Sequence, residues 1–227
     1  MVALTFDDGP DPAWTPLVLD ALDAAGASAT FFVVAEQIEA PGGAEVLAET
    51  LRRGHVVQMH CTRHVRHEQL DRDSLACDVQ ALEEALTAHG VSNPALWRPP
   101  YGSVHPSHSC PVADERGRQL IRWTHDTLDY RGLSAASMLE FARGGGGPDP
   151  SVLGGAALRA DSIVLMHDSR RYSSTPEGGA QGTVALIEPL VEYARERGWE
   201  LGTLGDHVDP AAHGSDATAA AFLLPCR

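Results

Sequence analysis

The chain has 227 residues, a formal net charge of −14, an isoelectric point of about 5.1 and 43% hydrophobic residues. This acidic balance argues against a nucleic-acid partner or an anionic membrane surface, since both require a basic face. No apolar run approaches the roughly 20 residues of a membrane-spanning helix. The hydrophobic content suits a single α/β domain with a full core.

The start of the chain and its cysteines bear on the cellular compartment. The first residues, MVALTFDDGP, contain neither the basic segment nor the apolar core of a secretory signal. If Met1 is the native start, we therefore expect a cytoplasmic protein with reduced thiols. The four cysteines are scattered without a CxxC pair, so their spacing does not predict cysteine-bound zinc.

Short β-type runs alternate with amphipathic helical runs along the chain. In chain order the pattern predicts strand Ala3–Phe6, helix Thr15–Ala25, strand Ala29–Ala35, helix Gly43–Arg53, strand Val56–His60, helix Asp71–His89, strand Leu96–Arg98, a weaker helix near Val112–Gln119, strand Leu120–Thr124, a weaker helix Ser134–Arg143, strand Ser162–His167, helix Thr183–Arg197 and strand Glu200–Thr203.

This alternation predicts an α/β fold with about seven parallel strands, and the pattern alone leaves closure into a barrel open. Chemistry in such folds gathers at the carboxyl ends of the strands. We expect one catalytic domain over residues 1–208 and an irregular tail over 209–227. Loops rich in Gly, Pro and Ser are expected at residues 143–155 and 169–182.

Polar, mostly titratable side chains follow five of the seven predicted strands. They are Asp7 and Asp8, His60 and His64, Arg98 and Tyr101, Asp126 and Asp129, and His167 and Asp168. Taken singly, each has an ordinary explanation, such as a turn aspartate before Gly-Pro or a histidine at the rim of a sheet. Their gathering at one rim indicates a functional site.

These residue types suit metal-assisted hydrolysis. If HCTRH is helical, its two histidines lie on one face. Two imidazoles and one carboxylate make an open zinc site, which polarises a carbonyl and lowers the pKa of bound water toward about 7. Of Asp7 and Asp8, one can bind the metal and the other accept a proton, since neighbouring side chains diverge in a strand. His167 can protonate a leaving group, while Arg98 and a nearby carboxylate fix the protonation states.

Five segments, in this order, resemble motifs of the polysaccharide deacetylase family (carbohydrate esterase family 4). TFDDGP resembles the first motif, HCTRH the second, RPPYG the third and VLMHD the fifth, and Asp129-Tyr130 stands where the fourth has Asp-Trp. The resemblance runs from Thr5 to about Leu204. It implies a distorted, NodB-like (β/α) barrel with fewer than eight strands. The implied reaction is hydrolysis of an N-acetyl group on an amino sugar, which releases acetate and a free amine.

The resemblance also implies roles for individual residues. Asp8, His60 and His64 bind the metal, Asp7 is the catalytic base and His167 is the general acid. The expected metal is Zn²⁺, although a His/His/Asp set also accepts Co²⁺ or Ni²⁺.

Further roles follow by the same resemblance. Arg98 tethers the base, Asp129 orients the acid, and the backbone amide of Tyr101 helps to hold the oxyanion. Tyr130 replaces the usual Trp that lines the groove for the acetyl methyl group, which leaves the shape of that pocket open. Cys61 replaces the usual Ser or Thr, and we interpret it as a small buried residue.

The segment SVHPSHSCP follows RPPYG and adds three unassigned side chains, His105, His108 and Cys110. We interpret it as a loop that faces the substrate. A second metal cluster is the alternative.

The substrate is less sharply indicated than the reaction. Without an export signal, we expect a cytosolic N-acetylglucosaminyl compound, and the chain resembles deacetylases of teicoplanin-type glycopeptide pseudoaglycones. The alternatives are a chitooligosaccharide or peptidoglycan deacetylase, an enzyme for another N-acyl group, and a non-catalytic, metal-holding sugar-binding module. A small glycoconjugate is the expected partner, and no oligomeric state is predicted.

Overall fold

The computed structural model describes residues 1–145, 153–173 and 180–205. The predicted tail at 209–227 and parts of both predicted Gly-rich loops lie outside the described residues. The described strands are β1 (Val2–Asp7), β2 (Thr30–Val34), β3 (Val56–Cys61), β4 (Leu96–Trp97), β5 (Gln119–Leu120), β6 (His125–Asp126), β7 (Ile163–His167) and β8 (Leu201–Gly202).

All these strands belong to one sheet, in the order β5-β4-β3-β2-β1-β7-β6, with β8 beside β1. Every ladder between them is parallel. Within the described residues no ladder joins β5 to β6, so the sheet curls without closing. This arrangement confirms the predicted fold class, a distorted (β/α) barrel of about seven parallel strands.

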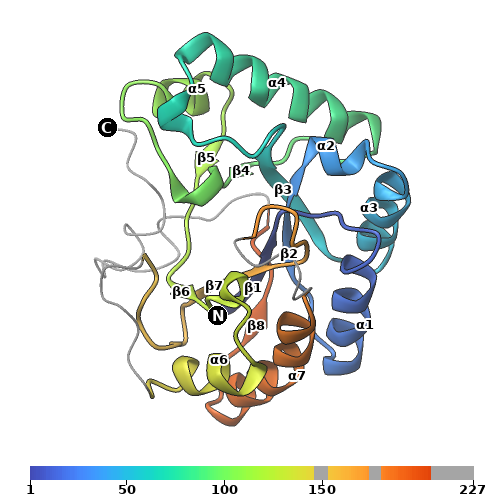
Figure 1. Cartoon of the computed structure of the whole chain (residues 1–227), viewed down its shortest axis with the longest axis vertical. Helices are drawn as coiled ribbons and strands as arrows, with labels where there is room; N and C mark the ends of the chain where they lie inside the picture. Colours follow the sequence, from blue (N-terminus) through green and yellow to red (C-terminus); the bar gives the residue numbers. More distant parts are fainter. Residues whose placement is uncertain (146–152, 174–179, 206–227) are drawn as a thin grey trace.

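Helices surround the outer side of the sheet (Figure 1). They are α1 (Thr15–Ala25), α2 (Ala35–Ile38), α3 (Gly43–Arg52), α4 (Arg72–Ala88), α5 (Ser109–Glu115), α6 (Ala135–Ala142) and α7 (Gln181–Glu196). Three short 3₁₀ turns are η1 (His67–Gln69), η2 (Pro100–Gly102) and η3 (Asp129–Arg131). In the described part of the chain, no helix combines the length and the apolar character needed to cross a membrane.

Helix boundaries follow local chemistry where capping residues are present. The Asp71 side chain accepts a hydrogen bond from the Ser74 amide at the start of α4 (Oδ1–N 2.7 Å), and Ser134 caps α6 through the Ser137 amide (Oγ–N 3.2 Å). Such caps satisfy amides that have no partner within the helix. The strong helix predictions are therefore correct to within a few residues.

Two predictions near residue 120 are wrong in detail. The helix expected near Val112–Gln119 ends at Glu115, because Gly117 takes a φ of 64° and Gln119 pairs with β4. The single strand expected over Leu120–Thr124 is replaced by two short strands, β5 and β6. After two residue pairs with β4, the chain leaves β5 and pairs as β6 with β7 at the other edge of the sheet.

The sheet has two buried faces, as expected for parallel strands. Leu4 and Phe6 of β1 pack in the larger apolar cluster, which also contains the buried helix residues. Ala3 belongs to a smaller cluster that contains no helix residue. Since side chains alternate along a strand, Thr5 and Asp7 share the inner face with Ala3. Strand β1 thereby places Asp7 at its carboxyl end, on the inner face of the open barrel.

Candidate active site

A cavity of about 360 Å³ lies where the strands end. Seven of the nine predicted site residues line it, namely Asp7, Asp8, His60, His64, Tyr101, Tyr130 and His167. The other two, Arg98 and Asp129, lie behind Asp7 and His167 and are hydrogen-bonded to them. The structure therefore brings all nine together.

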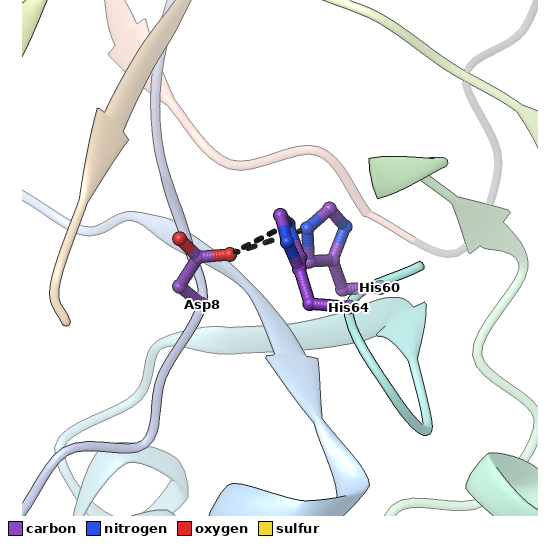
Figure 2. Close-up of side chains that lie close together, drawn as sticks. All are labelled: Asp8, His60 and His64. Carbon is purple, nitrogen blue, oxygen red and sulfur yellow. Dashed lines mark ion pairs between the residues drawn. The ribbon is translucent and has the colours of Figure 1, made fainter. Parts of the chain in front are cut away.

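Asp8, His60 and His64 form a compact cluster of potential metal ligands (Figure 2). The Asp8 Oδ1 atom lies 3.4 Å from His60 Nε2 and 3.2 Å from His64 Nε2. One donor atom from each residue lies within 4.8 Å of the others. Asp8 Oδ1 is buried and accepts no hydrogen bond from the described residues. Two imidazole nitrogens and one carboxylate oxygen are a donor set that suits Zn²⁺, so the residues fit a divalent metal ion.

The backbone aims two of these side chains toward each other. Asp8 follows the end of β1 with a φ of 79°, which turns its carboxylate away from the direction of Asp7. His60 lies in β3, and its Nδ1 donates a hydrogen bond to the carbonyl oxygen of Arg98 at 2.6 Å. This bond fixes the tautomer and leaves Nε2 free to bind a metal.

His64 is reached by a bend and not by a helix, so the helical interpretation of HCTRH is wrong. Strand β3 continues through Cys61, and the chain then turns at Thr62 and Arg63. The Asp78 carboxylate accepts hydrogen bonds from both turn amides, at 3.0 Å from the Thr62 nitrogen and 3.2 Å from the Arg63 nitrogen. This turn replaces the helical hydrogen bonds and still brings the two imidazoles to a ring-centroid separation of 5.2 Å.

Two of the three side chains favour their metal-binding form. Burial lowers the pKa of His64 to about 4, so its ring is neutral near pH 7. Burial alone would raise the pKa of Asp8, but the nearby imidazoles, His60 first, outweigh this effect and lower it. His60 differs: burial lowers its pKa, but the carboxylates of Asp7 and Asp8 outweigh burial and raise it, so a metal ion would compete with a proton at this ring.

Asp7 is held by a buried arginine. Arg98 Nη1 donates hydrogen bonds to Asp7 Oδ1 at 2.7 Å and to Thr5 Oγ1 at 2.8 Å. The Arg98 side chain is fully buried, and its Cζ lies 3.9 Å from the centroid of the Phe32 ring. The guanidinium therefore fixes the position and orientation of the Asp7 carboxylate.

His167, the register partner of Asp7 on the neighbouring strand β7, is held by Asp129. Asp129 Oδ1 lies 2.7 Å from His167 Nδ1, and Asp129 Oδ2 accepts hydrogen bonds from the His167 amide and the Thr183 hydroxyl, each at 2.8 Å. Burial lowers the pKa of His167, but the carboxylates of Asp129, Asp8 and Asp7 outweigh it and raise that pKa to about 10. The ring is therefore protonated near pH 7 in the metal-free protein.

The two tyrosines expected at the site stand beside different histidines, one a candidate metal ligand and the other the expected general acid. Tyr101 lies in η2 with a φ of 58°, and its ring is 4.5 Å from the His64 ring, edge to face. Tyr130 lies in η3, with its ring 5.7 Å from that of His167. Tyr130 thus stands beside the expected general acid.

Several residues of the cavity were not predicted. Arg66, Trp123, Leu165 and Tyr172 also line it, and nothing in the local sequence pattern distinguishes them. Asp126 lines it as well, and burial raises the pKa of this carboxyl to about 7. The sequence signal for Asp126 was its place among the polar side chains that follow the predicted strands, but no role was assigned to it there.

The unassigned sulfur and imidazole groups form no second site in the described residues. Cys61 is buried, as interpreted, and burial raises the pKa of its thiol well above the usual range. The rings of His105 and His108 stack at 3.9 Å, but they belong to no group of three possible ligands. Residues 103–111 do not line the cavity, so the substrate-facing role of this loop stays a prediction.

The fold and the cluster together define a class: an open parallel (β/α) barrel with a divalent-metal site at the carboxyl ends of its strands. Comparison with protein families narrows this class. The family described as Polysaccharide deacetylase matches residues 1–121, more than half of the chain. The chain belongs to this family.

Individual relatives agree with this membership. The chain is 30% identical over 203 residues to a Peptidoglycan-N-acetylglucosamine deacetylase of Bacillus cereus, covering 89% of this chain but only 66% of that protein. It is 28% identical to a Chitooligosaccharide deacetylase of a Bradyrhizobium species, covering 89% and 88%. The crystal structure of the Bc1960 peptidoglycan N-acetylglucosamine deacetylase superposes with a TM-score of 0.74 at 30% identity, covering 89% of this chain and 85% of that one.

Proposed function

We propose that the protein is a metal-dependent carbohydrate N-deacetylase. Its substrate would be an N-acetylglucosamine unit within a glycan of the peptidoglycan or chitooligosaccharide kind, and its products acetate and a free amine. The names of the relatives support these glycans, and thereby favour the alternative expected from the sequence over a glycopeptide conjugate. That a glycopeptide pseudoaglycone is the substrate stays a prediction, and the acetate-release test includes this compound.

One observation carries the proposal. A carboxylate held by a buried arginine and an imidazole held by a buried aspartate flank a metal-binding cluster within one cavity. A sugar-binding module would need none of these polarised pairs, because recognition of hydroxyl groups does not require a base and an acid at the same carbonyl.

Asp8, His60 and His64 would hold the metal ion. When bound, a divalent cation there would polarise the acetamide carbonyl and acidify a water molecule, as Zn²⁺ does in other hydrolases. The ion in question is Zn²⁺, with Co²⁺ and Ni²⁺ as substitutes that the same donor set accepts.

Asp7 would accept the proton of the attacking water. Its Oδ1 accepts a hydrogen bond from Arg98, which fixes the orientation of the carboxylate while it faces the cavity. General-base catalysis of this kind contributes about 10²–10⁴-fold to a rate.

His167 would donate a proton to the departing amine. The Nδ1 atom of His167 is occupied by Asp129, which leaves Nε2 as the nitrogen that can deliver the proton. The elevated pKa of His167, about 10, keeps the ring charged at neutral pH, the form that a general acid requires. The backbone amide of Tyr101 would help to stabilise the oxyanion that forms from the acetamide carbonyl.

The apolar lining offers a place for the acetyl methyl group. Leu165, Trp123 and Tyr130 line the cavity, and all are large apolar or amphipathic groups. Tyr130 is narrower than Trp, so acyl groups larger than acetyl are the enzymatic alternative at this position.

The test measures acetate release from three N-acetylglucosamine substrates, with zinc-loaded and chelator-treated protein. The substrates are a chitooligosaccharide, peptidoglycan fragments and a teicoplanin-type pseudoaglycone. We expect turnover on at least one of the first two, lost on chelation and restored by Zn²⁺. Turnover on the pseudoaglycone alone would replace the proposed substrate. Metal binding without acetate release from any of them would favour the sugar-binding module.

A further inference from the structure

The two histidines of the metal cluster are oriented by different means. His60 is fixed by a hydrogen bond from Nδ1 to the Arg98 carbonyl oxygen at 2.6 Å. Histidines that bind metals through one nitrogen usually donate from the other to an oxygen, and this outer bond sets the ring orientation. His64 Nδ1 is buried and has no hydrogen-bond partner among the described residues. Something other than a hydrogen bond must therefore hold the His64 ring.

Two tyrosine rings contact His64 instead. Tyr172 stacks on the imidazole with a centroid separation of 4.4 Å and an interplanar angle of 16°. Tyr101 approaches the same ring edge to face, at 4.5 Å and 60°. The two contacts restrict the ring in different directions, and only 6% of the His64 side chain is exposed. We refer to Tyr101 and Tyr172 as the aromatic clamp.

Tyr172 is itself held by the segment that follows the general acid. The Ser173 amide donates to the Arg170 carbonyl oxygen at 3.1 Å, which closes a turn around Tyr172. The Ser173 hydroxyl donates to the Tyr130 carbonyl oxygen at 2.8 Å, and this bond ties the turn to η3. The turn therefore presents the Tyr172 ring to His64 from a fixed backbone.

The stacking contact involves the ring of Tyr172 and not its hydroxyl. The Tyr172 hydroxyl oxygen is buried and makes no hydrogen bond with the described residues. A phenyl ring of the same size would therefore make the same contact with His64, whereas an aliphatic side chain would lose the flat surface on which the imidazole rests.

We infer that Tyr172 is a positioning residue of the metal site, which orients His64 by stacking and takes the place of the missing outer hydrogen bond. This inference rests on the proposed function in one respect, the binding of a divalent cation by Asp8, His60 and His64. It adds a residue from the segment after β7 to a site whose ligands come from the first 64 residues. Outer partners of metal-bound histidines typically account for a 10–100-fold difference in metal affinity.

The experiment compares Tyr172→Leu and Tyr172→Phe with the unaltered full chain. The Kd for Zn²⁺ is measured by competition with a chromogenic chelator, and the absorption spectrum of Co²⁺-loaded protein reports the ligand geometry. We expect Tyr172→Leu to weaken Zn²⁺ binding by about 10–100-fold and to alter the Co²⁺ spectrum. Tyr172→Phe should keep both within about threefold of the unaltered protein, because the hydroxyl takes no part.

Tyr130→Leu is the matched control for metal affinity, since Tyr130 lines the same cavity but contacts His167 and not His64. Thermal unfolding of the metal-free variants separates a local effect from a loss of fold. The inference is overturned if folded Tyr172→Leu binds Zn²⁺ as tightly as the unaltered protein, or if Tyr172→Phe is as weak as Tyr172→Leu. It is overturned too, together with the metal-dependent function, if the unaltered protein binds no Zn²⁺. Tight Zn²⁺ binding without acetate release contradicts the proposed function alone.

Discussion

Asp7 and Asp8 are adjacent in the chain but have different surroundings. Asp7 ends a strand and faces a buried guanidinium, whereas Asp8 lies beyond the strand with a positive φ and faces two imidazoles. A single peptide unit thus separates a candidate proton acceptor from a candidate metal ligand. Substitution of Asp7 should therefore affect proton transfer, whereas substitution of Asp8 should affect metal binding.

Asp7→Asn should therefore bind Zn²⁺ as well as the unaltered protein does but release acetate about 10²–10⁴-fold more slowly, because the amide cannot accept the proton of water. Asp8→Asn should instead weaken Zn²⁺ binding. Isothermal titration with Zn²⁺ and an acetate assay measure the two effects separately. Near-normal turnover by metal-loaded Asp7→Asn would disprove the base assignment.

The pair of His167 and Asp129 predicts a shift in the pH profile. Asp129 is the largest of the influences that raise the pKa of His167, so Asp129→Asn should lower that pKa. The general acid must be protonated, and the alkaline limb of the kcat profile should move to lower pH by about 1–3 units. Acetate release measured from pH 6 to pH 10 checks the shift.

Thr183→Val is the control for this profile, because it removes a hydrogen bond to Asp129 and leaves the negative charge in place. Its alkaline limb should move less than that of Asp129→Asn. An unchanged limb in Asp129→Asn would mean that another group donates the proton.

Sequence motifs were sufficient to name the nine residues that the structure brings together, because most of them lie in strands or in the short segments that follow strands. They were not sufficient for Tyr172. Its contact with His64 joins positions 108 residues apart, and neither a 2-residue nor a 3.6-residue period marks such a pair. The expected helix at HCTRH failed for a related reason: its turn depends on Asp78, which lies in another element.

At the scale of elements, helix α4 supports the metal site from outside the sheet. Asp78 projects from α4 and accepts both amides of the turn between His60 and His64, and its backbone carbonyl accepts the Thr62 hydroxyl at 2.6 Å. The Asp78 side chain is largely buried, so its loss leaves two amides without acceptors. The position of His64 consequently depends on a helix that carries no ligand.

Asp78→Ala should destabilise the protein by about 1–3 kcal/mol, the typical cost of a buried polar group left unpaired. It should also weaken Zn²⁺ binding, because the turn that carries His64 loses its anchor. Urea unfolding of the metal-free protein and chelator competition measure the two quantities. Asp78→Asn keeps one acceptor oxygen and should fall between the unaltered protein and Asp78→Ala, and an unchanged Zn²⁺ affinity in both would contradict this role.

At the scale of the molecule, metal binding is coupled to the folded state, because Asp8, His60 and His64 come together only when the chain is folded. An ion that binds only the native protein stabilises it by about 2.7 kcal/mol at a concentration 100 times its Kd. For a chain of this size we expect Zn²⁺ to raise the Tm by roughly 5–11 °C. Differential scanning calorimetry with and without Zn²⁺ measures the shift. His64→Ala should show little of it, and an equal shift in that variant would place the ion elsewhere.

The order of the strands has a consequence for how the protein is made. Strand β1 lies between β2 and β7, and Thr5 donates its hydroxyl hydrogen bond to Val164, 159 residues further along the chain. Asp7 and Asp8 are thus synthesised before the other site residues, and the strand β7 that places His167 beside them follows more than 150 residues later. Contacts so distant in sequence close slowly. A nascent chain that ends before Ile163–His167 lacks one of the strands that flank β1, so we expect tight metal binding to be a late event that reports completion of the native fold.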